Sequence, residues 1–90
     1  MSILVEVFTA PGCSQCGRAK DVLRKIVEAW ADNRLEWREV NLLEEIDYAV
    51  QLGVLATPAI AVGGKLVFTA LPSEKKLHQL LQQQLEASDR

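Results

Sequence analysis

The spacing of hydrophobic and polar residues divides the chain into alternating strand-like and helix-like segments. The stretch Ile3–Thr9 is rich in β-branched and aromatic residues and is followed by the turn-forming letters APG, which predicts a buried strand. Apolar residues then recur in steps of three and four, the period of an amphipathic helix, at Ala19, Val22, Leu23, Ile26, Val27 and Trp30. We expect this helix to begin at Cys13–Ser14 and to end near Ala31.

The second half of the chain continues this alternation. Leu35–Leu42 predicts another strand, and Leu43–Gly53 predicts a short helix ending on glycine, the residue that most readily adopts the left-handed conformation after a helix. Two further strands, TPAIAV and KLVFTA, are separated by two glycines, which is a hairpin signal. The segment PSEKKLHQLLQQQL predicts a last helix capped by Ser73. Its expected buried residues are Leu77, Leu80, Leu81 and Leu85.

The order of these segments, βαβαββα, predicts an α/β fold. One helix connects the first two strands, so we expect them to be parallel with a right-handed crossover. The last two strands are joined by two residues and must be antiparallel. We therefore expect a four-stranded mixed sheet flanked by helices, and a single domain over residues 1–90.

Composition and charge exclude several classes of function. The net charge is −2 and 24% of the residues are charged, so the chain lacks the basic surface of proteins that bind nucleic acid or anionic lipid. No apolar run is long enough to span a membrane. The opening MSILVEVFTA lacks the basic start and cleavage site of a signal peptide. We expect a cytoplasmic protein that binds neither nucleic acid nor membranes.

The only two cysteines, Cys13 and Cys16, follow the first strand and a Pro-Gly turn and open the first predicted helix. A helix N-terminus stabilises an anion through its unpaired amide groups and its dipole, which lowers the pKa of a thiol there. We expect the Cys13 thiolate to attack a substrate disulfide. Cys16, one turn further and more buried, would then attack the mixed disulfide and release the reduced substrate. A reducing compartment favours this chemical role over a structural disulfide.

Two other interpretations of the cysteine pair stay open. Free cysteines are often buried as small hydrophobic residues. Two cysteines can also supply half of a zinc or iron–sulfur site that is shared between two chains. A single chain offers few ligands, because the only histidine, His78, is distant in sequence, so we expect no metal and no other cofactor. We expect His78 at the surface, and Arg18 and Lys20 as solvated helix charges.

A proline directly before the third strand, in the pair Thr57-Pro58, provides a second signal. Proline at such a position is confined to an edge, a strand start or a cis turn. Together with the C-x-x-C pair and the Gly-Gly-Lys hairpin, it makes the chain resemble the thioredoxin/glutaredoxin superfamily from Ile3 to about Leu85. The resemblance implies that Pro58 is cis, faces the cysteines and helps to keep metals off the two sulfurs. It also implies that the Thr57 backbone pairs with an extended substrate segment.

Residues next to the cysteines complete the predicted site. We expect Gly12, Ser14 and Gln15 to contact the substrate together with Thr57 and Pro58. The Trp-Gly-Pro surroundings typical of thioredoxins are missing, and their buried aspartate on the first strand aligns with Val7. Only twelve residues precede Cys13, so the resemblance is to the minimal, glutaredoxin-sized core of small bacterial and archaeal thioredoxin-like proteins.

The chain also departs from the glutaredoxin pattern for binding glutathione. Glutaredoxins usually carry a lysine three residues before the first cysteine, an aromatic between the cysteines and Gly-Gly-x-Asp after the last strand. Ala10, Gln15 and Ala70–Ser73 stand at these places. We therefore expect a monomeric thiol–disulfide oxidoreductase that reduces protein disulfides and receives electrons from a protein or dithiol reductant, such as a thioredoxin-reductase-like protein. The alternatives are a glutathione-coupled glutaredoxin and a non-enzymatic redox sensor, adaptor or metal carrier with this fold.

Overall fold

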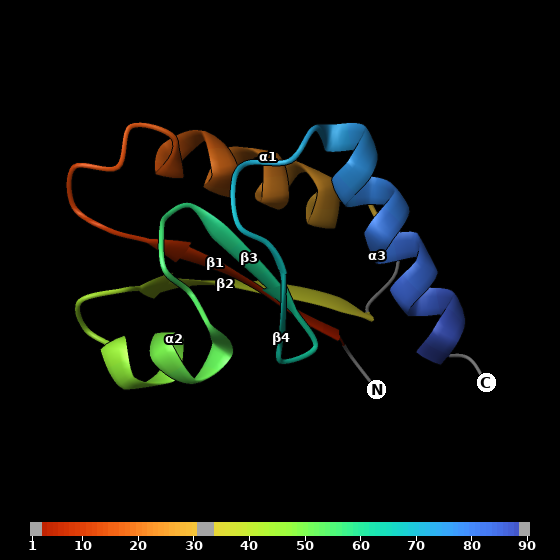
Figure 1. The fold of residues 1–90 in the computed structure, drawn as a ribbon. Coiled ribbons are helices and arrows are strands. Elements are labelled where there is room, and N and C mark those ends of the chain that lie inside the picture. The colour runs from red at the N-terminus through yellow and green to blue at the C-terminus, as the bar shows by residue number, and fades with distance from the viewer. Residues whose placement is uncertain (1–2, 31–33, 89–90) are drawn as a thin grey trace.

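The computed structural model describes residues 3–30 and 34–88 and has the predicted order of elements, βαβαββα (Figure 1). The strands are β1 (Ile3–Thr9), β2 (Leu35–Asn41), β3 (Ala59–Val62) and β4 (Lys65–Phe68). The helices are α1 (Cys16–Ala29), α2 (Ile46–Leu52) and α3 (Glu74–Ser88). Within the described ranges, no helix is both long and apolar enough to cross a membrane.

The four strands form one mixed sheet in the order β2-β1-β3-β4. β1 runs parallel to β2 and antiparallel to β3, and β3 is antiparallel to β4, which confirms the predicted sheet. Gly63 and Gly64 join β3 to β4 with φ angles of 61° and 84°. A two-residue hairpin turn requires such positive angles, and glycine adopts them without steric cost.

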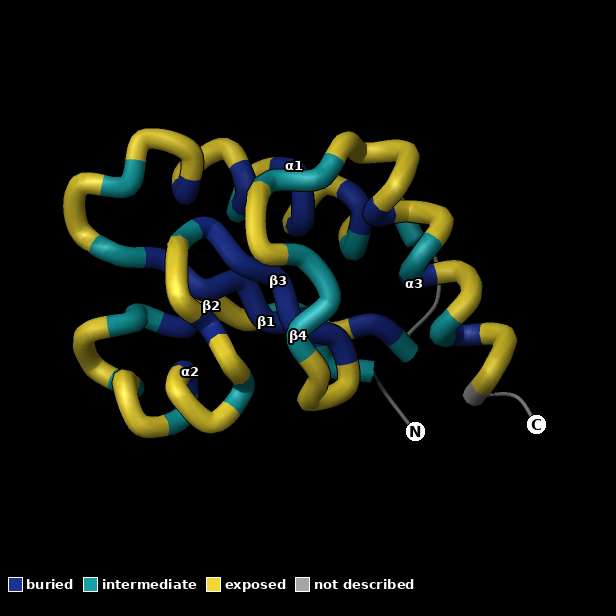
Figure 2. The backbone as a smooth tube through the Cα atoms, viewed as in Figure 1, coloured by how far each residue is buried: buried dark blue, intermediate teal, exposed yellow. Residues whose placement is uncertain are grey.

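Helices cover both faces of the sheet, α1 and α3 on one face and α2 on the other (Figure 1). Alternate side chains of β1 point to opposite faces, so Val5 and Val7 belong to the core under α1 and α3, whereas Phe8 belongs to the core over α2. Figure 2 shows that both central strands, β1 and β3, are buried along most of their length. The predicted leucines of α3 belong to this core: Leu77, Leu81 and Leu85 are buried, and Leu80 packs against it half-buried.

Turns shorten two of the predicted helices. α1 begins at Cys16, later than the predicted Cys13–Ser14, because Gly12 has a φ of 80° and Cys13 N–H donates to the Ala10 carbonyl in a turn. α1 ends at Ala29, and its predicted end near Ala31 lies outside the described residues. α2 begins at Ile46 rather than Leu43, because the Asn41 side chain accepts a hydrogen bond from Leu43 N–H at 2.9 Å and closes a turn.

Two other predicted helix ends agree with the structure, the start of α3 and the end of α2. Ser73 caps α3, because its Oγ accepts a hydrogen bond from Lys76 N–H at 3.2 Å. Gly53 follows α2 with a φ of 89°, in the left-handed conformation expected of a helix C-cap.

One carboxylate, Glu6 of β1, is buried in the sheet face that α2 covers, with 1% of its surface exposed. Arg38 of β2 donates two hydrogen bonds to Glu6 Oε2, at 2.9 and 2.7 Å. Tyr48 of α2 donates its hydroxyl to Glu6 Oε1 at 2.6 Å. A buried charge is costly unless it is paired and hydrogen-bonded, so this network fixes α2 against β1 and β2.

The hydrogen bond to Glu6, followed by burial, raises the pKa of Tyr48 above its usual 10.0. A group whose pKa is higher in the folded state contributes stability that is fully present below its unfolded pKa and is lost as the pH rises through the folded pKa. We expect Tyr48→Phe to lower the free energy of unfolding by about 1–2 kcal/mol at pH 7. The difference from the wild type should shrink only above about pH 10, as measured by urea unfolding between pH 7 and 12. A difference that stays constant up to pH 12 would contradict this assignment.

Candidate active site

The register of the sheet brings three loops together at one end. Phe8 of β1 pairs with Ala59 of β3, so the loop that follows β1 adjoins the loop that precedes β3. Thr9 pairs with Asn41 in the parallel ladder, so the loop that follows β2 lies at the same end. The first loop carries Cys13 and the second carries Thr57 and Pro58. Two sequence motifs more than 40 residues apart therefore meet because of strand pairing.

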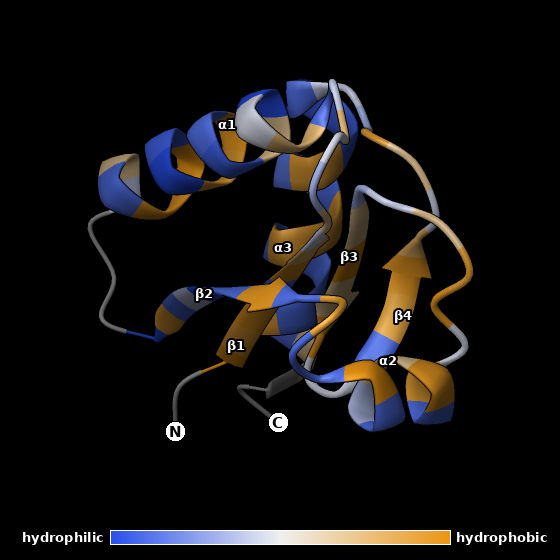
Figure 3. Ribbon diagram, turned by 90° about the vertical axis from the view of Figure 1, so that its left-hand side faces the viewer, coloured by the Kyte–Doolittle hydropathy of each residue, from blue (hydrophilic) through white to orange (hydrophobic). Residues whose placement is uncertain are grey.

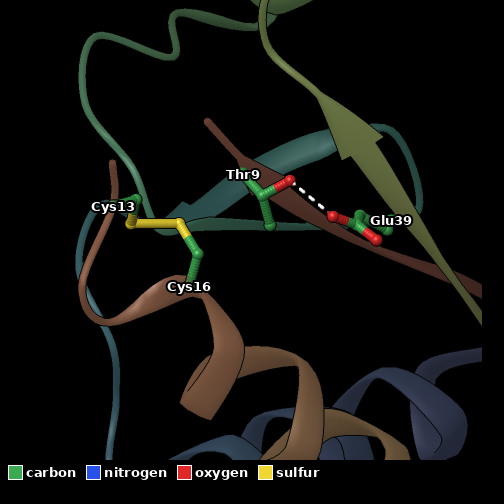
Figure 4. Close-up of a disulfide and its surroundings, with 4 residues drawn as sticks. All are labelled: Thr9, Cys13, Cys16 and Glu39. Carbon is green, nitrogen blue, oxygen red and sulfur yellow. Dashed lines mark hydrogen bonds between the residues drawn. A yellow bond between two sulfur atoms is a disulfide. The ribbon is translucent and has the colours of Figure 1, made fainter. Parts of the chain in front are cut away.

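The two cysteines form a disulfide, with their Cα atoms 5.5 Å apart (Figure 4). Cys13 lies in the loop and is half-buried, whereas Cys16 is the first residue of α1 and only 5% exposed. This difference in access agrees with the predicted roles, in which an accessible sulfur is attacked first and a buried one follows. The pair does not consist of two separate thiols in the core. Among residues 3–30 and 34–88, there is no group of three or more His, Cys, Asp or Glu side chains that could hold a metal ion.

A shallow pocket of ≈ 350 Å³ lies beside Cys13 and brings most of the predicted contact residues together. Its lining residues are Pro11, Gly12, Cys13, Ser14, Gln15 and Thr57. Pro58 is buried behind Thr57, and the peptide bond between them is cis, as the resemblance implied. His78 lies elsewhere, exposed on α3 with its ring stacked on Trp30 at 4.4 Å. An open groove of ≈ 1020 Å³ between α1 and α3 contains neither cysteine.

The start of α1 provides an electropositive end next to the disulfide. Gln15, the N-cap residue, makes no side-chain cap hydrogen bond, and the first turn of the helix carries no acidic side chain. The first amide groups of α1 thus lack a capping partner among the described side chains, and a nearby negative charge is stabilised by them. Cys13 precedes the N-cap by two residues instead of opening the helix, but its disulfide bond holds its sulfur against the first residue of α1.

A polar cluster beside the disulfide was missed by the sequence analysis. Thr9, at the end of β1, donates its hydroxyl to Glu39 Oε2 of β2 at 2.7 Å (Figure 4). Lys20 Nζ lies 3.5 Å from Glu39 Oε1. Lys20 follows Cys16 by four residues, so both occupy one side of α1. Lys20 thus remains partly exposed to solvent, as expected, and also forms an ion pair with Glu39, while the exposed Arg18 lies outside this cluster. The one available signal in the sequence was the threonine at the end of a mostly apolar strand.

A Cys-x-x-Cys disulfide at the start of a helix, set against a cis-proline loop at the end of a mixed sheet, defines a protein of the dithiol–disulfide exchange class. Comparisons with known proteins agree with this class. A family model for the thioredoxin domain matches residues 1–82. A probable thioredoxin of Methanothermobacter thermautotrophicus is 28% identical over 86 residues, which cover 96% of this chain and 100% of the relative. A thioredoxin of Methanocaldococcus jannaschii is 28% identical over 83 residues, which cover 92% of this chain and 96% of the relative.

A solved structure described as a malarial protein superposes with a TM-score of 0.78 at 18% identity, covering 92% of this chain and 97% of that one. At this identity the likeness shows the fold alone. The chain belongs to the thioredoxin domain family. With the Cys13–Cys16 pair in place, it is a thiol–disulfide oxidoreductase in the general sense of that family.

Proposed function

We propose that the protein reduces disulfides of other proteins through a mixed-disulfide intermediate, with Cys13 as the nucleophile and Cys16 as the resolving cysteine. The observation that carries this proposal is the asymmetric pair itself. A half-buried sulfur faces a pocket, and it is bonded to a buried sulfur at the start of an uncapped helix. Thiol–disulfide exchange needs an accessible thiolate for the first attack and a close second thiol for release.

The reaction proceeds in two balanced exchanges. The Cys13 thiolate attacks one sulfur of the substrate disulfide, forms a mixed disulfide with it and expels the other substrate sulfur as a thiolate. Cys16 then loses its proton to solvent and attacks Cys13 Sγ, which releases the second substrate thiolate and forms the Cys13–Cys16 disulfide. Two electrons have passed from the dithiol of the protein to the substrate. A reductant that supplies two electrons must restore the dithiol before the next cycle.

The residues around Cys13 support an extended protein segment as the substrate. Gly12, Ser14, Gln15 and Thr57 line an open, shallow pocket, which suits a segment of backbone better than an enclosed small molecule. Thr57 lies in the loop two residues before β3, where its backbone can pair with such a segment. Pro58, the next residue, is buried and does not line the pocket.

We assign the reducing role to a protein dithiol in preference to glutathione. Ala10, Gln15 and Ala70–Ser73 provide none of the charged and aromatic contacts that glutaredoxins offer to glutathione. We propose a cytoplasmic location as well, because a reductase of this kind needs a compartment in which its dithiol is regenerated.

The test is to trap the intermediate on insulin. The reduced Cys16→Ser variant is expected to stop at a mixed disulfide between Cys13 and one insulin chain, because no second thiol remains to release it. Mass spectrometry of the intact adduct without reductant measures this product, and dithiothreitol should reverse it. The wild type should release free insulin chains and accumulate no adduct. Adduct formation by the double variant Cys13→Ser with Cys16→Ser, or no adduct with Cys16→Ser alone, would contradict the proposed roles.

A further inference from the structure

Four large hydrophobic side chains are exposed in the described part of the chain, and all of them lie in the stretch 43–55. They are Leu43 (66% exposed), Ile46 (48%), Val50 (66%) and Leu55 (96%), here called the α2 surface. Figure 3 shows hydrophobic residues along α2 and in the loop that joins it to β3. Large apolar side chains that gather on one exposed surface commonly mark a binding site. The inner side of α2 already packs on the sheet through Ala49, so its outer side is left for a second contact.

The α2 surface lies at the same end of the sheet as the disulfide. Leu43 belongs to the loop after β2, and Leu55 precedes Thr57 of the pocket by two residues. The turn at Asn41 holds the first of these loops, since Asn41 accepts hydrogen bonds from Leu43 N–H and Glu45 N–H. Leu43 and Leu55 are therefore at the same end of the sheet as the pocket, and a protein docked on Cys13 can contact them. Ile46 and Val50 continue the apolar surface from there along α2.

Acidic residues border the α2 surface. The stretch 43–55 contains Glu44, Glu45 and Asp47 and no lysine, arginine or histidine. Arg38 lies 3.7 Å from Glu45, but Glu44 and Asp47 are exposed. A partner binds this surface most tightly if it has apolar side chains at the centre of its contact and lysine or arginine around them, because the basic residues then face the acidic border.

The area of the α2 surface favours a transient partner over a second copy of the chain. A specific, stable interface buries about 800 Å² on each side, and four aliphatic side chains offer only a fraction of that. Two copies joined through this surface would also bring their acidic borders together, which costs free energy.

We infer that the α2 surface docks the folded protein that exchanges disulfides with Cys13, and that this partner presents an apolar patch bordered by basic residues. The inference rests on the proposed function, because the partner must carry a dithiol or disulfide within reach of Cys13. Contacts on α2 lie beyond the few backbone positions that an extended segment occupies at Thr57. They add affinity for a folded surface and select it by charge.

The test uses two synthetic amphipathic helical peptides whose single cysteine is blocked as a mixed disulfide with 5-thio-2-nitrobenzoate. Both carry the same leucine face, bordered by lysines in one peptide and by glutamates in the other. The reduced protein is mixed with each, and release of the coloured thiol gives the second-order rate constant. We expect the lysine peptide to react about tenfold faster at low salt, and the ratio to approach one at about 0.5 M salt.

Surface variants separate docking from chemistry. Leu43→Ser with Val50→Ser should slow the lysine peptide about five- to tenfold, and Glu44→Gln with Asp47→Asn should reduce the preference for lysine to near one. Neither pair should change the rate with the small symmetric disulfide of 5-thio-2-nitrobenzoate, which reports the reactivity of Cys13 alone. Gln83→Ser, at an exposed position of α3 on the other side of the sheet, is the matched control and should change nothing.

Three results would overturn the inference. One is an equal rate for both peptides at low salt, and another is a preference that survives the variants. The third is analytical ultracentrifugation that shows a dimer dissociated by Leu43→Ser with Val50→Ser, because a second copy would then occupy the surface. If the small disulfide itself fails to react with the wild type, the proposed function fails instead.

Discussion

Replacement of Cys13 by serine is expected to lower the rate of insulin reduction by roughly a thousandfold or more, to the rate of the dithiothreitol background. The serine hydroxyl does not ionise near neutral pH, so no nucleophile is present for the first exchange. Cys16 cannot replace it, because only 5% of Cys16 is exposed. The measurement is the turbidity of the released insulin chains with dithiothreitol as the electron source.

The control for this prediction is the rate of the first exchange in Cys16→Ser. That variant keeps Cys13 and should react with a small aromatic disulfide at a rate near that of the wild type, although it cannot complete a cycle. Cys13→Ser should fail in both assays. More than a tenth of the wild-type activity in Cys13→Ser would assign the nucleophile to another group.

The second large effect concerns stability. Arg38→Met should lower the free energy of unfolding by about 2–3 kcal/mol, because it leaves the carboxylate of Glu6 buried without its main partner. Removing one member of a fully buried pair costs about 3–5 kcal/mol. The expected loss is smaller here, since the Arg38 side chain is 43% exposed and solvent already screens part of the interaction. Urea unfolding of the oxidised protein at pH 7 measures it.

Two further variants show whether the effect comes from the buried charge. Glu6→Leu combined with Arg38→Met removes both charges and should recover most of the stability lost in Arg38→Met alone. Arg24→Met is the matched control, because Arg24 of α1 makes ion pairs only at the surface, with Asp21 and Glu28. Such pairs contribute about 0–1 kcal/mol. An equal loss in Arg24→Met and Arg38→Met would show that the buried charge is not the cause.

Local patterns in the sequence were sufficient for the order of elements and for the location of the cysteines. Strand β1 was predicted with both its ends, because six of its seven residues are apolar or β-favouring and a Pro-Gly turn follows soon after. The cap at Ser73 and the glycine stop at Gly53 follow from backbone chemistry within one or two turns of a helix. The joint position of Cys13 and Thr57 needed the family resemblance as well, since only strand pairing brings the two loops together.

Interactions between distant residues could not be predicted in the same way. Glu6 pairs with residues 32 and 42 positions away, and in the sequence it is one polar residue in an apolar strand. Thr9 and Glu39 are 30 positions apart. Apolar and polar residues alternate irregularly along β2, so the sequence does not show which face of the sheet Glu39 occupies. The start of α1 was predicted two to three residues too early, because the spacing of apolar residues carries no information about the left-handed backbone at Gly12 and the turn that follows it.

The direction of β3 also determines where a label or a linker can be attached to the protein. β3 starts beside the cysteines and runs away from them, so the exposed turn at Gly63–Gly64 lies at the opposite end of the sheet. A fluorophore, an affinity handle or an immobilising linker grafted into this turn stays clear of the reactive sulfurs. The protein can thus be tethered to a sensor chip with its redox end facing the solution.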